Sequence, residues 1–341
     1  MIKIENFGTL ATGERVLRYT LVNQNGTSLS VLNYGATVQS LVYKGKDVCV
    51  GFEDAADYDH NEAYLGATVG RVAGRLTNSC FPFGGDVCRI QCKEGNALHG
   101  GDDGFSFRFW NVDVIEASDD PSIRFSLVSP DGDMGFPGEI AVSVVFTLTE
   151  EDVWRLEYEA VSDKDTVVNL TNHMYFNFDG YDGEDVRNTL VTIHADRFLR
   201  LSEDLLPSGE TPDVEGTAFD FRSEKSLQAA LDRSHPMLEA AKGLDTGFCV
   251  GDEGTFRHVA TMRSQNSGIG THCYTDMPLL QVYMGNYLHF AKGKGGPLYQ
   301  YQGVCMETQR YSDAPNHPEF PDITLCAGDT FRTCTEFRFF S

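Results

Sequence analysis

The stretch EIAVSVVFTLTEEDVWRLEYEA, residues 139–160, decides the fold class. Apolar side chains recur at every second position in both halves, with acidic residues between the halves. The apolar set is Ile140, Val142, Val144, Phe146 and Leu148, followed by Trp154, Leu156, Tyr158 and Ala160. A period of two places successive side chains on opposite faces of a strand. The stretch therefore predicts two strands, each with one face on a core.

The same alternation extends outward along the chain. It recurs in residues 17–21, 123–127, 191–193 and 280–283, with turn signals such as Asn25-Gly26 between the runs. Helical pattern is confined to Ser223–Leu231, with Ser223 as its cap, and Pro236–Lys242. The βα alternation of a parallel sheet and the Rossmann and P-loop glycine fingerprints are missing. We therefore expect an all-β fold, a large antiparallel β-sandwich with one or two short helices.

The length of 341 residues would by itself suggest about two domains. No low-complexity linker and no fixed-period repeat divides the chain, so residues 1–341 are expected to form a single domain.

The chain is strongly acidic, with 50 Asp and Glu against 27 Lys and Arg and a formal charge of −23. Such a surface repels phosphate backbones and anionic membranes, which disfavours nucleic acid and lipid as partners. Neutral small molecules fit this charge best. The sequence leaves open whether the protein is a monomer or a homodimer.

Cysteine usage and the N-terminus predict a cytoplasmic protein. The sequence shows no apolar run of about 18 residues and no secretory pattern in Met1–Glu5. Nine cysteines are then expected to be reduced. Cys88 and Cys92 lack a second Cys or His pair at zinc spacing, so packing thiols are favoured over a zinc site.

The most informative polar stretch is GVCMETQRYSDAPNHPEFP, residues 303–321. Glu307 follows an apolar, strand-like approach and precedes a proline-rich loop, which predicts a carboxylate held at the end of a rigid strand. A buried glutamate is costly unless it is paired or functional. The alternative is a structural glutamate bonded to loop N–H groups.

Three further segments carry candidate site residues. His99 precedes a Gly-Gly turn that permits close approach to a ligand. His173 shares one face of a predicted strand, residues 171–178, with Tyr175 and Asn177, as in the lining of a concave sheet. Asp245 lies between two glycines. Taken singly, each also fits a structural role: a turn histidine, a solvated strand face and an Asx turn.

Taken together, the chain closely resembles the galactose mutarotase (aldose 1-epimerase) family. The matching motifs occur in family order and span nearly the whole chain. They are GRVAGR at 70–75, NALHGG at 96–101, SPDGDMGFPGE at 129–139, NLTNHMYFNF at 169–178, GLDTGF at 243–248 and METQRYSDAPNHPEFP at 306–321.

The resemblance implies a large β-sandwich with a sugar cleft that interconverts C1 anomers of free hexoses, such as galactose and glucose, without cofactor or metal. It implies Glu307 as general base and His173 as general acid. The same resemblance assigns the binding of sugar hydroxyls or the ring oxygen to four further residues: His99, Asp245, Arg75 and Gln281.

The sequence departs from the family at two positions. Gly74 stands where the family commonly has Asn, and Thr246 stands where it commonly has His. Neither position carries proton chemistry, and both bear on sugar preference.

Mutarotation needs a base for the C1 hydroxyl proton and an acid for the ring oxygen, and a carboxylate and an imidazole suit both roles near neutral pH. We expect an ionised Glu307 and, favoured by its charge, a protonated His173.

Three alternatives remain. His99, His173 and Glu307 could form a metal triad, although no close-spaced H-x-D/E pair supports it. The protein could bind or sense sugar on the same fold without catalysis. An epimerase of hexose 6-phosphates would need a basic pocket, which the sequence does not reveal.

Overall fold

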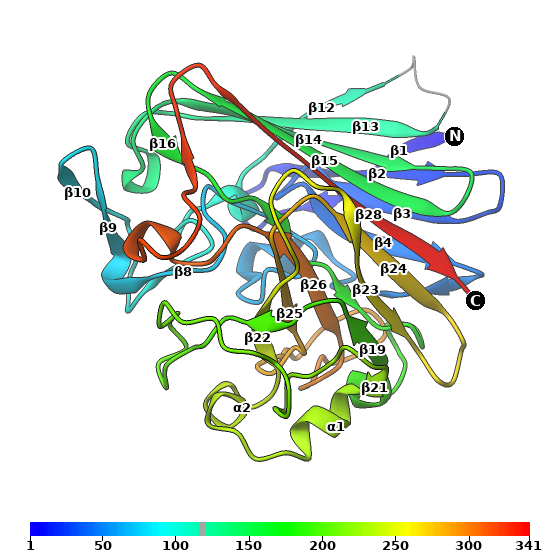
Figure 1. Cartoon of the computed structure of the whole chain (residues 1–341). Coiled ribbons are helices and arrows are strands. Elements are labelled where there is room, and N and C mark those ends of the chain that lie inside the picture. The colour runs from blue at the N-terminus through cyan, green and yellow to red at the C-terminus, as the bar shows by residue number, and fades with distance from the viewer. Residues whose placement is uncertain (116–119) are drawn as a thin grey trace.

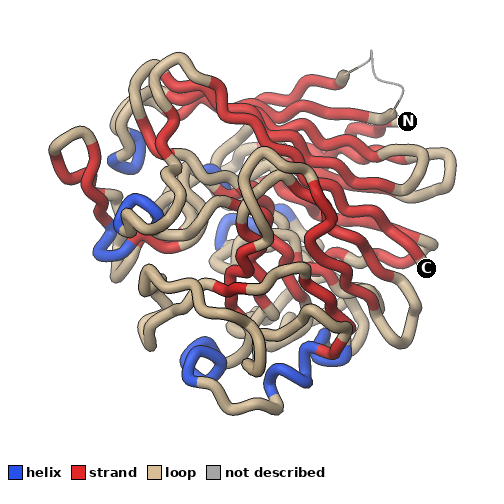
Figure 2. The backbone as a smooth tube through the Cα atoms, viewed as in Figure 1, coloured by secondary structure: helices blue, strands red, loops and turns tan. Residues whose placement is uncertain are grey.

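Antiparallel strands are the main regular elements of the computed structural model, which describes residues 1–115 and 120–341 (Figures 1 and 2). The largest sheet has nine strands. In spatial order they are β12 (Asn111–Val114), β13 (Ser122–Ser129), β14 (Ile140–Leu148), β15 (Val153–Ser162), β28 (Thr330–Phe340), β24 (Gly270–Thr275), β23 (Arg257–Arg263), β19 (Leu190–Ile193) and β21 (Lys225–Ser226).

Two further sheets complete the main framework. The N-terminal sheet runs β1 (Ile2–Thr9), β2 (Arg15–Val22), β3 (Ser28–Leu32), β4 (Thr37–Tyr43) and β5 (Lys46–Asp47). The six-stranded sheet runs β20 (Arg197–Phe198), β22 (Asp245–Cys249), β25 (Leu279–Tyr283), β26 (Val304–Gln309), β18 (Tyr175–Phe176) and β6 (Cys49–Val50).

Small ladders tie the connecting segments together. They are β10 (Asp86–Arg89) with β9 (Cys80–Phe83), β11 (Ala97–Leu98) with β8 (Arg75–Leu76), β16 (Thr166–Val167) with β27 (Thr324–Leu325), and β17 (Thr171–Asn172) with β7 (Thr68–Val69). The α-helices of the described residues are α1 (Leu227–Leu231) and α2 (Pro236–Ala241), beside each other at the bottom of Figure 1. No helix in the described part of the chain is long and apolar enough to cross a membrane.

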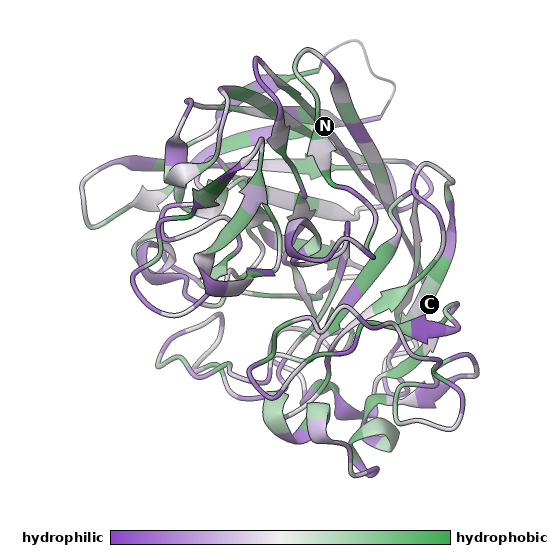
Figure 3. Cartoon of the chain, turned by 60° about the vertical axis from the view of Figure 1, so that its left-hand side comes forward, coloured by the Kyte–Doolittle hydropathy of each residue, from purple (hydrophilic) through white to green (hydrophobic). Residues whose placement is uncertain are grey.

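The main core lies between the three large sheets. Phe146 and Trp154 from the nine-stranded sheet, Val282 and Met306 from the six-stranded sheet and Leu29 from the N-terminal sheet belong to one buried cluster. Figure 3 shows hydrophobic segments along the strands and many hydrophilic residues in the loops. Burying each such side chain stabilises the fold by about 1.5–3 kcal/mol. The alternation of residues 139–160 predicted this burial, and every apolar residue named there is buried.

The predicted first helix, Ser223–Leu231, begins later than expected, because α1 spans Leu227–Leu231. Ser226, rather than Ser223, is the N-cap, and its side chain accepts a hydrogen bond from the Ala229 N–H. Lys225 and Ser226 instead extend the edge of the nine-stranded sheet, pairing with β19. The pairing overrides the helix-forming composition of this segment.

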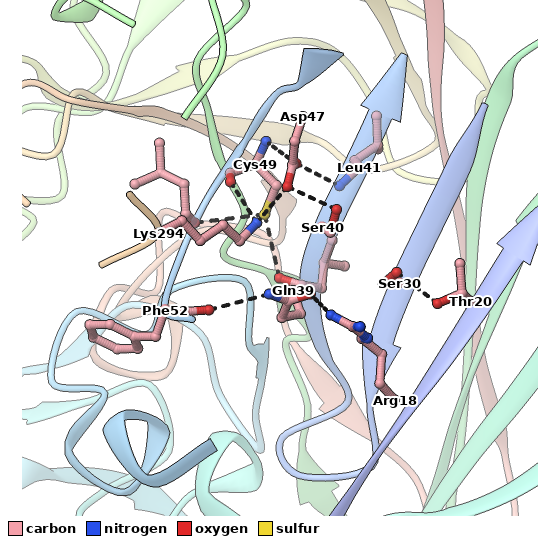
Figure 4. Close-up of polar contacts among 12 residues, drawn as sticks. Arg18, Thr20, Ser30, Gln39, Ser40, Leu41, Asp47, Cys49, Phe52 and Lys294 are labelled. Carbon is pink, nitrogen blue, oxygen red and sulfur yellow. Dashed lines mark hydrogen bonds and ion pairs between the residues drawn. The ribbon is translucent and has the colours of Figure 1, made fainter. Parts of the chain in front are cut away.

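A buried ion pair anchors the long connection between β25 and β26 (Figure 4). The Lys294 ammonium donates to Asp47 Oδ2 at 2.8 Å and to the Cys49 carbonyl at 3.0 Å. Asp47 also accepts from the Ser40 hydroxyl and the Leu41 N–H. Lys294 is only 5% exposed, and this contact holds the connection at residue 294 against β5 and β6.

Candidate active site

All six residues predicted for the site line one cavity of about 320 Å³, a size typical of small-molecule sites. They come from segments far apart in the sequence and are Arg75, His99, His173, Asp245, Gln281 and Glu307.

Three of these residues are placed by adjacent strands of the six-stranded sheet. Asp245 begins β22, Gln281 lies in β25 and Glu307 lies in β26. Gln281 is the direct cross-strand partner of Glu307, so their side chains share a face. The Gln281 amide donates to Asp245 Oδ1 at 2.5 Å. Glu307 does not end its strand as predicted, because β26 continues to Gln309.

His173 lies between two short strands. The single strand predicted for residues 171–178 is wrong, because β17 pairs with β7 and β18 pairs with β26 and β6. The break at His173 is held by hydrogen bonds to the backbone of Gly66 and Ala67. It turns the imidazole toward the cavity, with Nε2 3.7 Å from Glu307 Oε1. The ring stacks on Tyr175, with 5.0 Å between centroids.

The other ring nitrogen of His173 meets a thiol. Cys305 Sγ lies 3.4 Å from His173 Nδ1, and Cys305 is fully buried. Cys305 and Glu307 lie two residues apart in β26 and therefore share a face. Burial raises the pKa of the Cys305 thiol well above its ordinary value. The thiol therefore stays protonated beside the imidazole.

His99 approaches the pair from a turn. Its backbone is left-handed, with φ +52°, and the next residue, Gly100, has no room for a Cβ because the Gly70 carbonyl oxygen would lie 2.0 Å away. His99 Nδ1 accepts a hydrogen bond from the Gly74 N–H at 3.2 Å. Burial holds the pKa of His99 well below its ordinary value, with smaller contributions from the charges of His173 and Arg75. A neutral ring that accepts at Nδ1 carries its hydrogen on Nε2.

Burial favours the neutral forms of the central pair. Desolvation lowers the pKa of His173 from 6.5 to about 4. Desolvation first, and the charge of Asp245 second, raise the pKa of Glu307 well above 4.5. The expectation of a protonated His173 beside an ionised Glu307 is therefore wrong for the sugar-free cavity. Glu307 Oε2 is buried and has no hydrogen-bond partner among the described residues.

Arg75 supplies the positive charge of the cavity. It lies in β8, opposite Leu98 of β11, and is half-buried. Desolvation raises the pKa of Asp245, and the Arg75 charge is the larger of the influences that oppose this rise. The guanidinium and the carboxyl thus offer donors and an acceptor to the same cavity.

A metal ion is also compatible with part of this arrangement. His99, His173 and Glu307 each offer a ligand atom, and these atoms lie within 4.8 Å of one another. Two imidazoles and a carboxylate are ligand types that suit zinc or iron.

The polar lining residues that sequence reasoning missed or left unassigned include Tyr64, Tyr175, Tyr283, Gln309 and Ser312. Gln309 and Tyr283 lie two residues beyond Glu307 and Gln281 on the same strand faces, so the period of two could have found them. No local signal marks Tyr64, whose ring contacts His99 edge-on. Of the two family departures, Gly74 lines the cavity, whereas Thr246 does not.

The comparisons with known proteins identify the family of this chain. The family model described as aldose 1-epimerase matches residues 17–338. Galactose mutarotase from Bos taurus is 36% identical, covering 98% of this chain and 97% of that protein. Aldose 1-epimerase from Escherichia coli is 36% identical over 94% of both chains. The crystal structure of galactose 1-epimerase from Lactobacillus acidophilus superposes with a TM-score of 0.87 at 28% identity, covering 100% of this chain and 98% of that one. The predicted resemblance is confirmed, and the chain belongs to the aldose 1-epimerase family.

Proposed function

We propose that this protein interconverts the α and β anomers of free hexoses such as galactose and glucose, with Glu307 and His173 as its acid–base pair. The observation that carries the assignment of this pair is the 3.7 Å approach of a buried imidazole to a buried carboxyl in a cavity walled by polar side chains. A proton-transfer pair has no purpose in simple sugar binding, whereas mutarotation requires one.

The pair holds one exchangeable proton in its neutral form. Passing this proton from Glu307 to His173 gives the carboxylate and imidazolium with which the reaction starts. Glu307 then takes the proton from the C1 hydroxyl while His173 protonates the ring oxygen, and the C1–O5 bond breaks. The open-chain aldehyde turns about C1–C2, and the same groups reverse their roles to close the ring on the other face. Each group contributes about 10²–10⁴-fold to the rate.

The remaining walls bind hydroxyls. His99 presents an Nε2–H donor, the Arg75 guanidinium several donors, and the bonded Asp245 and Gln281 pair both donors and acceptors. Fixing the ring in this way holds C1 and O5 at the acid–base pair, and such positioning accounts for much of an enzyme's rate.

Polarimetry of freshly dissolved α-D-galactose and α-D-glucose tests the proposal. The wild type is expected to speed equilibration, whereas Glu307→Gln and His173→Asn each lose at least about 10²-fold in kcat. Glu319→Gln, an exposed carboxylate in the same segment, serves as the matched control. Near-native turnover of Glu307→Gln would refute the general base. Sugar binding without faster equilibration would make this a non-catalytic sugar-binding protein.

We also propose that the enzyme works in the cytoplasm, as a monomer or homodimer, and without metal or cofactor. All nine cysteines are free, which supports a reducing compartment. Metal analysis and assays with and without a strong chelator test the metal statement, because the triad of His99, His173 and Glu307 would give a chelator-sensitive enzyme.

A further inference from the structure

We propose that the hydroxyl of Ser312, oriented by the Gln309 amide, binds a hexose hydroxyl and takes the place of a side chain at position 74. The inference rests on the proposed function, since it concerns how the same cavity recognises its sugar. It identifies a specificity-determining pair outside the six residues predicted from the sequence.

The two residues form a built feature of the cavity. Gln309 is 1% exposed and Ser312 is 8% exposed, and both line the cavity with Glu307. Gln309 follows Glu307 by two positions in β26 and therefore points to the same face. Its amide donates to Ser312 Oγ at 3.0 Å.

That contact leaves a donor free. A serine hydroxyl has one hydrogen to donate and two acceptor positions. Among the residues that the structure describes, the Gln309 amide is the only hydrogen-bond partner of the Ser312 hydroxyl, and it uses one acceptor position. The Ser312 O–H is therefore free to donate to a sugar oxygen in the cavity.

Position 74 explains why a hydroxyl is needed there. Gly74 has φ +82°, and a Cβ added to it would lie 2.2 Å from Ser312 Oγ and 2.7 Å from Ser312 Cβ. A side chain at 74 and the side chain of Ser312 therefore compete for the same space. With glycine at 74, this space is occupied by the Ser312 side chain, which brings a hydroxyl to this part of the cavity wall.

Gly74 also positions His99, one of the residues predicted to bind sugar. The Gly74 N–H donates to His99 Nδ1, and the Gly74 carbonyl accepts from the His99 N–H at 3.0 Å. A clash at position 74 would consequently shift the His99 imidazole as well as Ser312. Removing the Ser312 side chain should relieve that clash.

Two sets of variants test the proposal. Ser312→Ala is expected to raise KM for galactose about 3- to 10-fold with little change in kcat, as expected for loss of one neutral hydrogen bond. Ser208→Ala, an exposed serine, is the matched control and should match the wild type. Among 2-, 3-, 4- and 6-deoxygalactose, one sugar should bind Ser312→Ala and wild type equally, which identifies the hydroxyl that Ser312 contacts.

The second set exchanges the two positions. Gly74→Asn alone is expected to lose more than about 10-fold in kcat/KM, because asparagine tolerates the left-handed backbone but meets Ser312. Gly74→Asn combined with Ser312→Gly should recover most of that loss. An unchanged KM of Ser312→Ala for galactose, or equal defects of the single and double variants, would overturn the proposal. If the wild type does not speed equilibration, the proposed function fails instead, and galactose titration of Ser312→Ala by calorimetry still decides the role of Ser312.

Discussion

The pH dependence of turnover offers the sharpest test of the acid–base pair. The one-proton state of His173 and Glu307 is the active state. Below both pKa values the pair holds two protons and has no base, and above both it holds none and has no acid. Because burial lowers the pKa of His173 to about 4 while Glu307 keeps its proton, the acidic limb of kcat/KM should lie near pH 4. A histidine of ordinary pKa beside the same protonated carboxyl would place that limb near 6.5.

The difference between the lowered and the ordinary pKa of His173 sets how much kcat/KM falls at acidic pH. With Glu307 protonated, a histidine with its ordinary pKa of 6.5 would leave only about a tenth of the enzyme in the one-proton active state at pH 5.5, whereas the lowered value leaves nearly all of it active. On the alkaline side, Glu307 retains the shared proton at pH values well above 4.5 because its pKa is raised. The profile of kcat/KM against pH should therefore stay flat from the pKa of His173 through the acidic range.

The assay is polarimetry of α-D-galactose from pH 5 to 8, with the buffer-catalysed rate subtracted at each pH. Dilute enzyme is needed toward the acidic end because the pI is about 4.6. Near-UV circular dichroism at each pH separates titration of the pair from unfolding. A tenfold fall in kcat/KM between pH 7.5 and 5.5, with the fold intact, would refute the lowered pKa of His173.

Three further predictions concern single substitutions. Lys294→Met should cost about 1.5–3 kcal/mol in urea unfolding because it removes the charged hydrogen bond to the part-buried Asp47 carboxylate. Lys292→Met, which breaks a more exposed pair, should cost less than about 1 kcal/mol; equal costs of the two substitutions would contradict this. Glu307→Gln should stabilise the fold by about 0.5–2 kcal/mol at neutral pH. Since the raised pKa makes folding take up a proton above pH 4.5, this gain should vanish toward that pH. Cys305→Ala should lower kcat about 5-fold by releasing His173 Nδ1, and Cys305→Ser should restore it; equal kcat in both variants would contradict that role.

Local periodicity predicted the framework well. Residues 139–160 form β14 and β15 because the alternation that buries one face is also the geometry of a paired strand. The misplaced start of α1 and the broken strand at His173 arise from pairing with β19, β7 and β26, which lie far away in the sequence. Local pattern does not encode such partners. The single-domain organisation of residues 1–341 stays a prediction.

The site was predictable from motifs and not from local physics. Nothing near Glu307 in the sequence indicates that His173 lies beside it, and the resemblance alone linked them. The protonation states were predicted wrongly because burial, which only the fold reveals, outweighs the attraction between the two charges. Ser312 escaped notice because its importance depends on its packing against Gly74, where the absent side chain leaves room for it.

The ladder of β22, β25 and β26 has a consequence for how this enzyme can change. Insertion of one residue into any of these strands would send Asp245, Gln281 or Glu307 to the opposite face of the sheet, so the chemistry tolerates no change in strand length. Gly74, His99 and Ser312 lie in connections, which tolerate changes in length and residue type better than paired strands do. New sugar preferences can therefore evolve around a fixed proton-transfer centre.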